Sequence, residues 1–357
     1  MNRATKAADH ARGSNEELHV TITELTQPGP EPRKRGVAAL LSNSVYRYSV
    51  VWALLLMIVL FSVLEPDAFV TSANAKSILG SQAILLIVAL GLTIPLAVNE
   101  FDLSIGAVVG FAQVVLAVLT VNHGWALGPA VIVSMLAALA IGAINAFLVV
   151  KIGVSSFIAT LGMGTLLGGL AIRLTDSAVI PGIPALVSDI ASTEFLGVQA
   201  VFWYGVVLAA LLWYVLKFTP GGRWLYFTGA NPDVARLNGL PVDRLRAGAL
   251  MASAGVAGFA GIMYAGVYGA ADPFSGEAFL LQAFAAVFLG ATAFSPGRFN
   301  AWGTFFSVYL VITGIVGLGM VTDQVGWLSN AFNGGVLILA VSVQRIVAKR
   351  REKLGSR

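Results

Sequence analysis

Two acids surrounded by apolar sequence are the residues with the clearest potential for chemistry in this chain. Glu100 and Asp102, flanked by Asn99 and Ser104, lie between two long apolar runs. A charge at the bilayer centre costs about 2.5–3.5 kcal/mol on insertion scales, so these carboxylates must lie outside the hydrocarbon or line a wet cavity. One interpretation is a short cytoplasmic turn in which Asp102 and Ser104 cap the following helix. The other is a broken helix whose N-terminal dipole faces a solute path.

Uncharged polar side chains inside other apolar runs extend this candidate path. They are Asn145, Thr160, Thr165 and Gln282. Hydrogen bonding between helices is the commoner role of such residues, and lining a polar path is the alternative. The histidines lie in the N-terminal segment or a loop without metal-ligand spacing, and the chain has no cysteine. We therefore predict no metal site and no convergent group of acids and histidines that would make this chain an enzyme.

A polar segment at residues 219–246 interrupts the apolar runs in the second half of the chain. Its candidate functional residues are Gly229, Asn231, Asp233, Val234, Ala235, Arg236, Gly239 and Leu240. Gly229 and Gly239 frame a short predicted helix that carries Asp233 and Arg236. A charged segment between membrane spans is expected to contact a soluble partner. The alternative is an ordinary loop whose arginines only set the topology.

Composition shows which elements must position these residues. Hydrophobic residues make up 57% of the chain and charged residues only 11%, against about 25% charged residues in soluble proteins. So few charges cannot cover a surface exposed to water, so most of the exterior faces lipid. The sequence thus predicts an all-α polytopic membrane bundle of about ten transmembrane helices, from apolar runs at 48–64, 78–98, 104–121, 127–150, 155–175, 200–218, 247–270, 278–294, 301–320 and 326–345.

The charge pattern predicts the orientation and the domain boundaries. Basic residues at 33–35 and 47 precede the first apolar run, so the positive-inside rule places the N-terminus in the cytoplasm. An even number of crossings returns the C-terminus to the same side, which gives an N-in/C-in topology. We expect a disordered cytoplasmic tail at 1–45, a transmembrane domain at 46–345 and a basic cytoplasmic tail at 346–357.

The region at 176–199 is predicted to be non-helical, because it contains Pro181, Pro184 and several glycines. It would form a cap or gate on the periplasmic side. The charges of the chain lie in loops rather than on one basic face, which gives no support for nucleic-acid binding. The chain lacks a Gly-x-x-x-x-Gly-Lys-Ser/Thr loop for nucleotide phosphates, so any ATP must be bound by another chain.

Four motifs in order resemble the permease subunits of ribose-type sugar ATP-binding-cassette (ABC) importers, over most of residues 48–345. They are Asp-Leu-Ser-Ile-Gly at 102–106, Phe-Ile-Ala-Thr-Leu-Gly at 157–162, Gly-x-Asn-x-x-x-Ala-Arg-x-x-Gly-Leu at 229–240, and Ala-Ala-Val-x-Leu-Gly-Ala-Thr at 285–292 followed by Pro-Gly-Arg at 296–298.

The chain also departs from the pattern of that family. Asn99, Glu100 and Phe101 stand where the family has Gly-Gly-Ile, and Ala291 and Pro296 each replace a glycine. Glu100 adds bulk and negative charge where neutral sugars are expected to pass. It could favour a polyol, an amine-bearing sugar or a cation as the solute, or it could be solvated at the membrane edge.

The resemblance implies a multi-pass subunit of the bacterial inner membrane that works with several partners. A periplasmic or lipid-anchored solute-binding protein would deliver a monosaccharide or related solute, and a second permease copy or a related permease would complete the path. A separate cytoplasmic ATPase would hold ATP and Mg²⁺, so this chain would bind no cofactor, and residues 219–246 would dock on that ATPase as the coupling loop. The alternative is a proton-coupled secondary transporter that uses Glu100 and Asp102.

Overall fold

The computed structural model describes residues 47–322 and 326–355, with the last helix given only by its backbone beyond residue 342. The predicted tail at 1–45 lies outside the described residues. The first part of the chain forms the helices α3 (Ser49–Leu64), α4 (Pro66–Phe69), α5 (Ser72–Ser81), α6 (Ala83–Ala97), α7 (Ile105–Ala117), α8 (Leu127–Phe147) and α9 (Ser156–Thr175). Single π-helical turns, η1 (Val118–Asn122) and η2 (Leu148–Ile152), extend α7 and α8.

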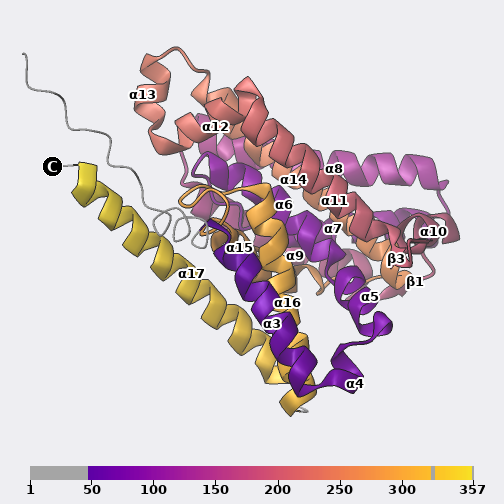
Figure 1. The fold of residues 1–357 in the computed structure, drawn as a ribbon. Helices are drawn as coiled ribbons and strands as arrows, with labels where there is room; N and C mark the ends of the chain where they lie inside the picture. The colour runs from indigo at the N-terminus through magenta and orange to yellow at the C-terminus, as the bar shows by residue number, and fades with distance from the viewer. Residues whose placement is uncertain (1–46, 323–325, 356–357) are drawn as a thin grey trace, which may run out of the picture. The chain divides into compact units, whose positions relative to one another are not determined.

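The second part of the chain is also helical (Figure 1). Its helices are α10 (Ala185–Ser192), α11 (Ala200–Phe218), α12 (Pro220–Ala230), α13 (Pro232–Leu237), α14 (Val242–Tyr268), α15 (Gly276–Gly290), α16 (Ala301–Thr322) and α17 (Gly326–Gly355). Two antiparallel pairs of very short strands join loops, namely β1 (Ile180–Pro181) with β4 (Ala270–Ala271), and β2 (Glu194–Phe195) with β3 (Val198–Gln199).

Within the described residues, seven helical stretches are long and apolar enough to cross a membrane. They are Ser72–Ala97, Ile105–Asn122, Leu127–Ile152, Ser156–Thr175, Ala200–Phe218, Val242–Tyr268 and Ala301–Thr322, and shorter apolar helices lie at Ser49–Leu64, Gly276–Gly290 and Trp327–Ser342. The prediction of an all-α polytopic bundle therefore fits the structure. The predicted number of crossings and the N-in/C-in orientation stay predictions.

Helix α14 packs along α6, α7 and α8 in the interior of the bundle. Its glycines allow this close packing, since a side chain at Gly258 would collide with Ala138 of α8, and one at Gly261 would collide with the Val109 carbonyl of α7. Every residue of α6 except Ile94 is buried. The burial of α6 and the packing of α14 on three helices place these two helices at the centre of the bundle, where the polar site is built.

The region at 176–199 differs from the prediction, because it contains the helix α10. Pro184 stands at the N-cap of α10, a position where proline does not oppose a helix, so residues 185–192 can coil after it. Val187 and Ala191 are buried, and α10 packs on α14 where Gly266 meets the Val187 carbonyl. This region lies at one end of the bundle, and α12 and α13 lie at the other (Figure 1).

Candidate functional site

The two acids lie on a tight turn between α6 and α7, at residues 98–104. Pro95 precedes the end of α6, and its carbonyl accepts the backbone N–H groups of Val98 (3.1 Å) and Glu100 (2.9 Å). Asn99 takes a left-handed conformation with φ of 62°, which asparagine tolerates better than most residues. The chain therefore reverses here without leaving the bundle, and Glu100, Asp102 and Ser104 are all buried.

Asp102 lies at the centre of a buried network of hydrogen bonds. Its Oδ1 accepts from the backbone N–H (3.0 Å) and the hydroxyl (2.6 Å) of Ser104. Its Oδ2 accepts from the hydroxyl of Ser253 on α14 (2.7 Å), and Asn145 on α8 donates to the Ser104 hydroxyl (2.9 Å). Each of these four residues is at most 1% exposed. The network thus ties the turn to two helices and satisfies both oxygens of the carboxylate.

The predicted capping of α7 takes a different form from the one expected. Ser104 occupies the N-cap position, but its hydroxyl makes no cap hydrogen bond and donates to Asp102 instead. Asp102 accepts the Ser104 N–H, immediately before the helix begins at Ile105. The carboxylate therefore takes the role at the start of α7 that a capping side chain would have.

The N-terminal end of α9 holds the backbone of the same turn. The hydroxyl of Ser156 accepts the N–H of Phe101 (3.1 Å), and the hydroxyl of Thr160 accepts the N–H of Leu103 (2.9 Å). The Thr160 hydroxyl also lies within donating distance of the carbonyls of Ser156 (2.7 Å) and Phe101 (3.1 Å). Three helices, α8, α9 and α14, therefore form hydrogen bonds with the turn.

Glu100 forms an ion pair with Arg246 near the beginning of α14. The Glu100 side chain is 8% exposed and the Arg246 side chain 28% exposed. The interpretation of Glu100 as a solvated acid at the membrane edge therefore does not describe this structure. Removing one partner of such a pair leaves a buried charge without compensation, which makes the pair a strong constraint on the turn.

The structure does not bring all of the predicted path residues together. Asn99 is exposed at the rim of the turn, Thr165 is exposed on α9 and bonds to the Leu161 carbonyl (3.1 Å), and Gln282 is half-buried on α15. Asn145 reaches the turn, but its Oδ1 is buried and has no hydrogen-bond partner among the described residues. The roles predicted for these residues in a solute path stay predictions.

Sequence reasoning missed three residues of the site. Ser253 is a single hydroxyl in an apolar helix and Ser156 is the first residue of α9, and nothing in one sequence shows which segment either hydroxyl contacts. Arg246 was predicted as a topology determinant and as the end of the coupling loop at 219–246, and its position close to an apolar run was the signal that it could pair with a buried acid. Gln113 is a further buried polar residue that was missed, and it binds Ser275 (2.6 Å) and the Asp272 carbonyl (3.2 Å) farther along α7.

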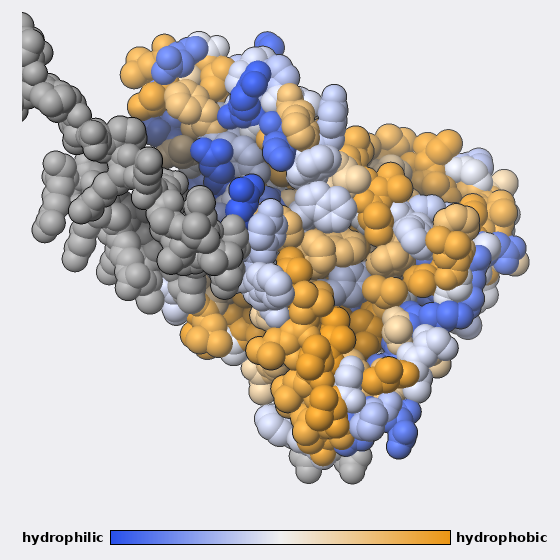
Figure 2. Space-filling model, in the orientation of Figure 1, coloured by the Kyte–Doolittle hydropathy of each residue, from blue (hydrophilic) through white to orange (hydrophobic). Residues whose placement is uncertain are grey.

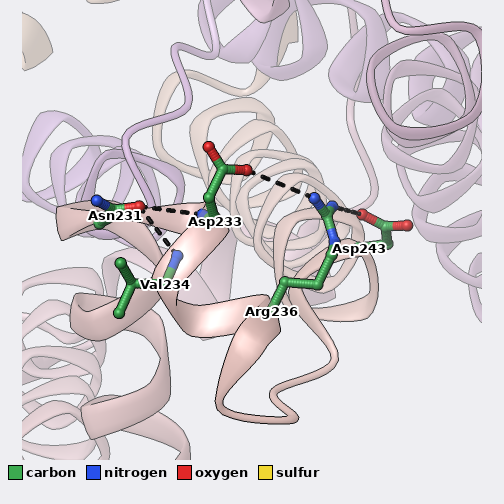
Figure 3. Close-up of polar contacts among 5 residues, drawn as sticks. All are labelled: Asn231, Asp233, Val234, Arg236 and Asp243. Atoms are coloured by element: carbon green, nitrogen blue, oxygen red, sulfur yellow. Dashed lines mark hydrogen bonds and ion pairs between the residues drawn. The ribbon is translucent and has the colours of Figure 1, made fainter.

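The polar segment at 219–246 folds into the helices α12 and α13 and the first turn of α14. The predicted short helix is present as α13, although Gly229 lies within α12 rather than between helices. Asn231 caps α13, because its side-chain oxygen accepts the N–H groups of Asp233 and Val234, each at 3.1 Å (Figure 3). Gly239 follows the helix with φ of 78°, a left-handed conformation that favours glycine.

The charged side chains of α13 are exposed and bind one another. Arg236 lies 2.9 Å from Asp243 on α14 and 3.8 Å from Asp233, between the two acids (Figure 3). Their side chains are 55–88% exposed. Val234 and Leu237 are exposed as well, at 41% and 87%, whereas Ala235 is fully buried. The helix α13 thus presents apolar and charged groups together on its exposed surface.

Two contacts join this exposed segment to the buried turn. Gly229 on α12 lies against the Ala97 carbonyl at the end of α6, where any side chain would collide. Arg246 joins the beginning of α14 to Glu100, and Asp243 of the same helix turn binds Arg236. The exposed segment and the turn are therefore linked both by a backbone contact and by ion pairs.

Comparison with known proteins identifies the family of this chain. The family described as "Branched-chain amino acid transport system / permease component" matches residues 74–341. The ribose import permease protein RbsC of Haemophilus influenzae is 28% identical over 301 residues, which cover 83% of this chain and 87% of that protein. The D-allose transport system permease protein AlsC of Escherichia coli is 27% identical, over 85% of this chain and 93% of that protein.

The autoinducer 2 import system permease protein LsrC of Salmonella typhi is 29% identical, over 82% of this chain and 84% of that protein. No solved structure was found that matches this chain. The family match covers most of the sequence, and the apolar helices fit its membrane location. This chain therefore belongs to the family of transport-system permease components, as its resemblance to ribose-type ABC permeases predicted, and is a multi-pass translocation subunit of the bacterial inner membrane rather than an enzyme.

Proposed function

We propose that this chain is the permease subunit of an ATP-driven importer for a monosaccharide or a related small polar solute. Relatives whose names specify ribose and D-allose support this solute class. The observation that carries the proposal is the contact between the exposed segment of α12 and α13 and the polar turn at 98–104. A permease driven by a separate ATPase needs such a connection between its outer surface and its membrane interior.

The helix α13 and its neighbours dock on the ATPase, which binds ATP and Mg²⁺. Arg236 and Asp233 supply charged contacts, and Val234 and Leu237 supply apolar ones. Asn231 and Gly239 keep the short helix in place from its two ends. Gly229 and Ala235 fit the segment against the bundle, and Leu240 closes the segment through its N–H, which donates to the Ala235 carbonyl (3.1 Å).

Movement of α13 reaches the turn by two routes. One route runs from α12 to the end of α6 through Gly229, and the other runs from Arg236 through α14 to Glu100. Rocking of helix bundles around a fixed solute site is the usual form of alternating access. The turn lies where both routes meet, so its displacement opens or closes the path on one side.

The solute path passes the turn and the exposed face of α9. Asn99, Glu100, Asp102, Ser104, Asn145 and Thr160 shape the polar part, while Thr165 and Gln282 lie farther along. Gly162 and Gly169 on α9 have open space beside them, which leaves room for a second permease copy or a related permease to complete the path. A periplasmic or lipid-anchored binding protein delivers the solute at the end of the bundle that carries α10.

A proton-coupled mechanism receives less support from the same geometry. Glu100 is held by Arg246, and Asp102 accepts hydrogen bonds from both Ser104 and Ser253. A proton carrier must exchange its partners during each cycle, whereas these two carboxylates are fixed in a packed network. The match to transport-system permeases and the exposed α13 both favour the ATP-driven alternative.

Affinity purification of the tagged chain, co-expressed with the neighbouring ATPase and binding-protein genes, tests this function. We expect the ATPase to co-purify with the wild type and to be lost from the variant Arg236→Glu, together with ATP-dependent ribose uptake into proteoliposomes. Lys151→Glu is the matched control, since Lys151 is exposed and lies outside the coupling segment. An ATPase that never associates, or normal uptake by Arg236→Glu, would contradict the proposal.

A further inference from the structure

A cavity of about 750 Å³ lies beside α12, at the end of α11 and the beginnings of α3 and α16. The last turn of α11, the first turn of α16 and the residues just before α3 surround it, and α12 closes one side. The path and the coupling contacts described above do not use this cavity. Four cationic side chains line it, namely Arg47, Lys217, Arg223 and Arg298, and no acid is among the described residues that line it.

Aromatic rings and a carbonyl, instead of acids, contact three of these cations. The Arg298 guanidinium lies 5.4 Å from the ring centre of Tyr226, and the Lys217 ammonium lies 5.3 Å from that of Trp213. Arg47 donates to the Phe294 carbonyl (3.0 Å). Cation–π contacts orient a cation without neutralising it, so the positive charge of the cavity is retained.

Three described arginines outside the cavity behave differently. Arg173, Arg236 and Arg246 each form an ion pair with an acid. In the part of the chain that the structure describes, none of the four cavity cations lies within 4.0 Å of a carboxylate. Cations that converge on one hollow repel one another unless an anion enters it, so the cavity is complementary to a negative ligand.

Burial raises the pKa of Tyr226 to about 12, although nearby Arg298 acts in the opposite direction. The phenol therefore remains neutral and donates to the Phe299 carbonyl (2.6 Å). Tyr226 adds no negative charge that could balance the four cations. It fixes the wall of the cavity and supports Arg298, so that the guanidinium faces a ligand site with a constant charge.

The position of the cavity indicates the kind of anion. Trp213 and Trp302 line it, and these residues concentrate at the boundary between lipid and water. The helix α3, which follows the cavity residues Arg47 and Tyr48 directly in the sequence, exposes Trp52, Leu56 and Val59. In Figure 2 hydrophilic side chains lie among hydrophobic ones at the end with α12 and α13, whereas hydrophobic side chains cover α3. A ligand with a phosphate head and apolar chains fits a basic cavity that lies next to an apolar helix surface.

We propose that this cavity binds the phosphate headgroup of an anionic phospholipid, with the acyl chains lying along α3 and α11. Basic pockets between transmembrane helices are known to bind such headgroups, and cations near a membrane surface attract them. Arg223 and Tyr226 belong to α12, so the bound lipid also braces the helix that contacts the end of α6. The proposal does not depend on which solute the permease carries.

Native mass spectrometry of the full-length protein in detergent tests the site. Cardiolipin, zwitterionic phosphatidylethanolamine and inorganic phosphate are titrated into the wild type and into Lys217→Gln/Arg223→Gln. The matched control is Lys151→Gln/Arg244→Gln, which also removes one lysine and one arginine, both exposed and outside the cavity. Each removed cation weakens attraction for anionic lipid, so we expect the cavity variant to bind cardiolipin roughly thirtyfold more weakly than the control.

Each outcome has a definite meaning. Equal cardiolipin binding by the cavity variant and the control would overturn the proposal. Saturation by inorganic phosphate, without preference for cardiolipin, would replace the lipid with a soluble anion. If the double variant does not elute as a folded protein, Lys217→Arg must retain cardiolipin and Lys217→Gln must bind it less tightly. Loss of transport with cardiolipin binding intact would contradict only the proposed function.

Discussion

The polar turn at 98–104 and the segment of α12 and α13 look alike in sequence and differ fully in structure. Both place acids and amides between apolar runs. The side chains of Glu100, Asp102 and Ser104 are buried, whereas those of Asp233, Arg236 and Asp243 are 55–88% exposed. Polar residues that find their partners inside the bundle become part of the packing, and those left outside remain available to another protein.

The difference also separates the energetics of the two regions. Exposed ion pairs such as that of Arg236 contribute about 0–1 kcal/mol, because water and salt screen them. Breaking a buried pair costs about 3–5 kcal/mol, because one charge is left without a partner. Substitutions in the turn should therefore mainly lower the free energy of unfolding. Substitutions in α13 should mainly weaken the proposed binding of the ATPase.

The largest expected effect comes from Arg246→Ala. It leaves the buried carboxylate of Glu100 unpaired, so we expect a loss of about 3–5 kcal/mol in the free energy of unfolding. Arg236→Ala is the matched control, since it removes an exposed arginine and should cost about 0–1 kcal/mol. Denaturant titration of both variants in detergent measures the two values. Similar losses in both would remove the distinction between the regions.

A smaller effect is expected from Ser253→Ala, which removes the only hydroxyl bonded to Oδ2 of Asp102 among the described residues. An unsatisfied buried acceptor costs about 1–3 kcal/mol. Ser134→Ala is the control, because the Ser134 hydroxyl is equally buried but has no hydrogen-bond partner among the described residues. Thermal unfolding should separate the two alanine variants. A Ser134→Ala variant as unstable as Ser253→Ala would show that burial, not the network, sets the cost.

The smallest expected effect on global stability comes from Asn231→Ala, which removes the cap of α13. Loss of an N-cap typically costs about 1 kcal/mol, and here it should be confined to one short exposed helix. Hydrogen exchange should accelerate in residues 232–237 and remain unchanged at the turn. Asn231→Asp keeps an acceptor and should restore protection. Faster exchange across the whole protein would show that the segment is not independent of the bundle.

Much of this architecture could be predicted from local sequence. Long apolar runs predicted the helices, and Gly229 and Gly239 predicted the short helix that the structure has as α13, although its N-terminal boundary is Asn231 and not Gly229. The partners of the turn could not be predicted, because Glu100 and Arg246 lie 146 positions apart and Asp102 and Ser253 lie 151 apart. One sequence shows that a buried acid needs a partner, but not which helix face supplies it. The helix α10 was not predicted, because prolines such as Pro184 usually indicate a loop. Here Pro184 only marks the N-terminal end of the helix.

The contact of Gly229 with the Ala97 carbonyl has a mechanical consequence. Most helix contacts are made through side chains, which can change rotamer and take up part of any displacement. Here one main chain rests directly on another, and neither can yield in that way. A displacement of α12 toward α6 must therefore move the end of α6 as well, because no side-chain rearrangement can absorb it. The residue without a side chain is therefore the one that makes the junction of α12 with α6 stiff.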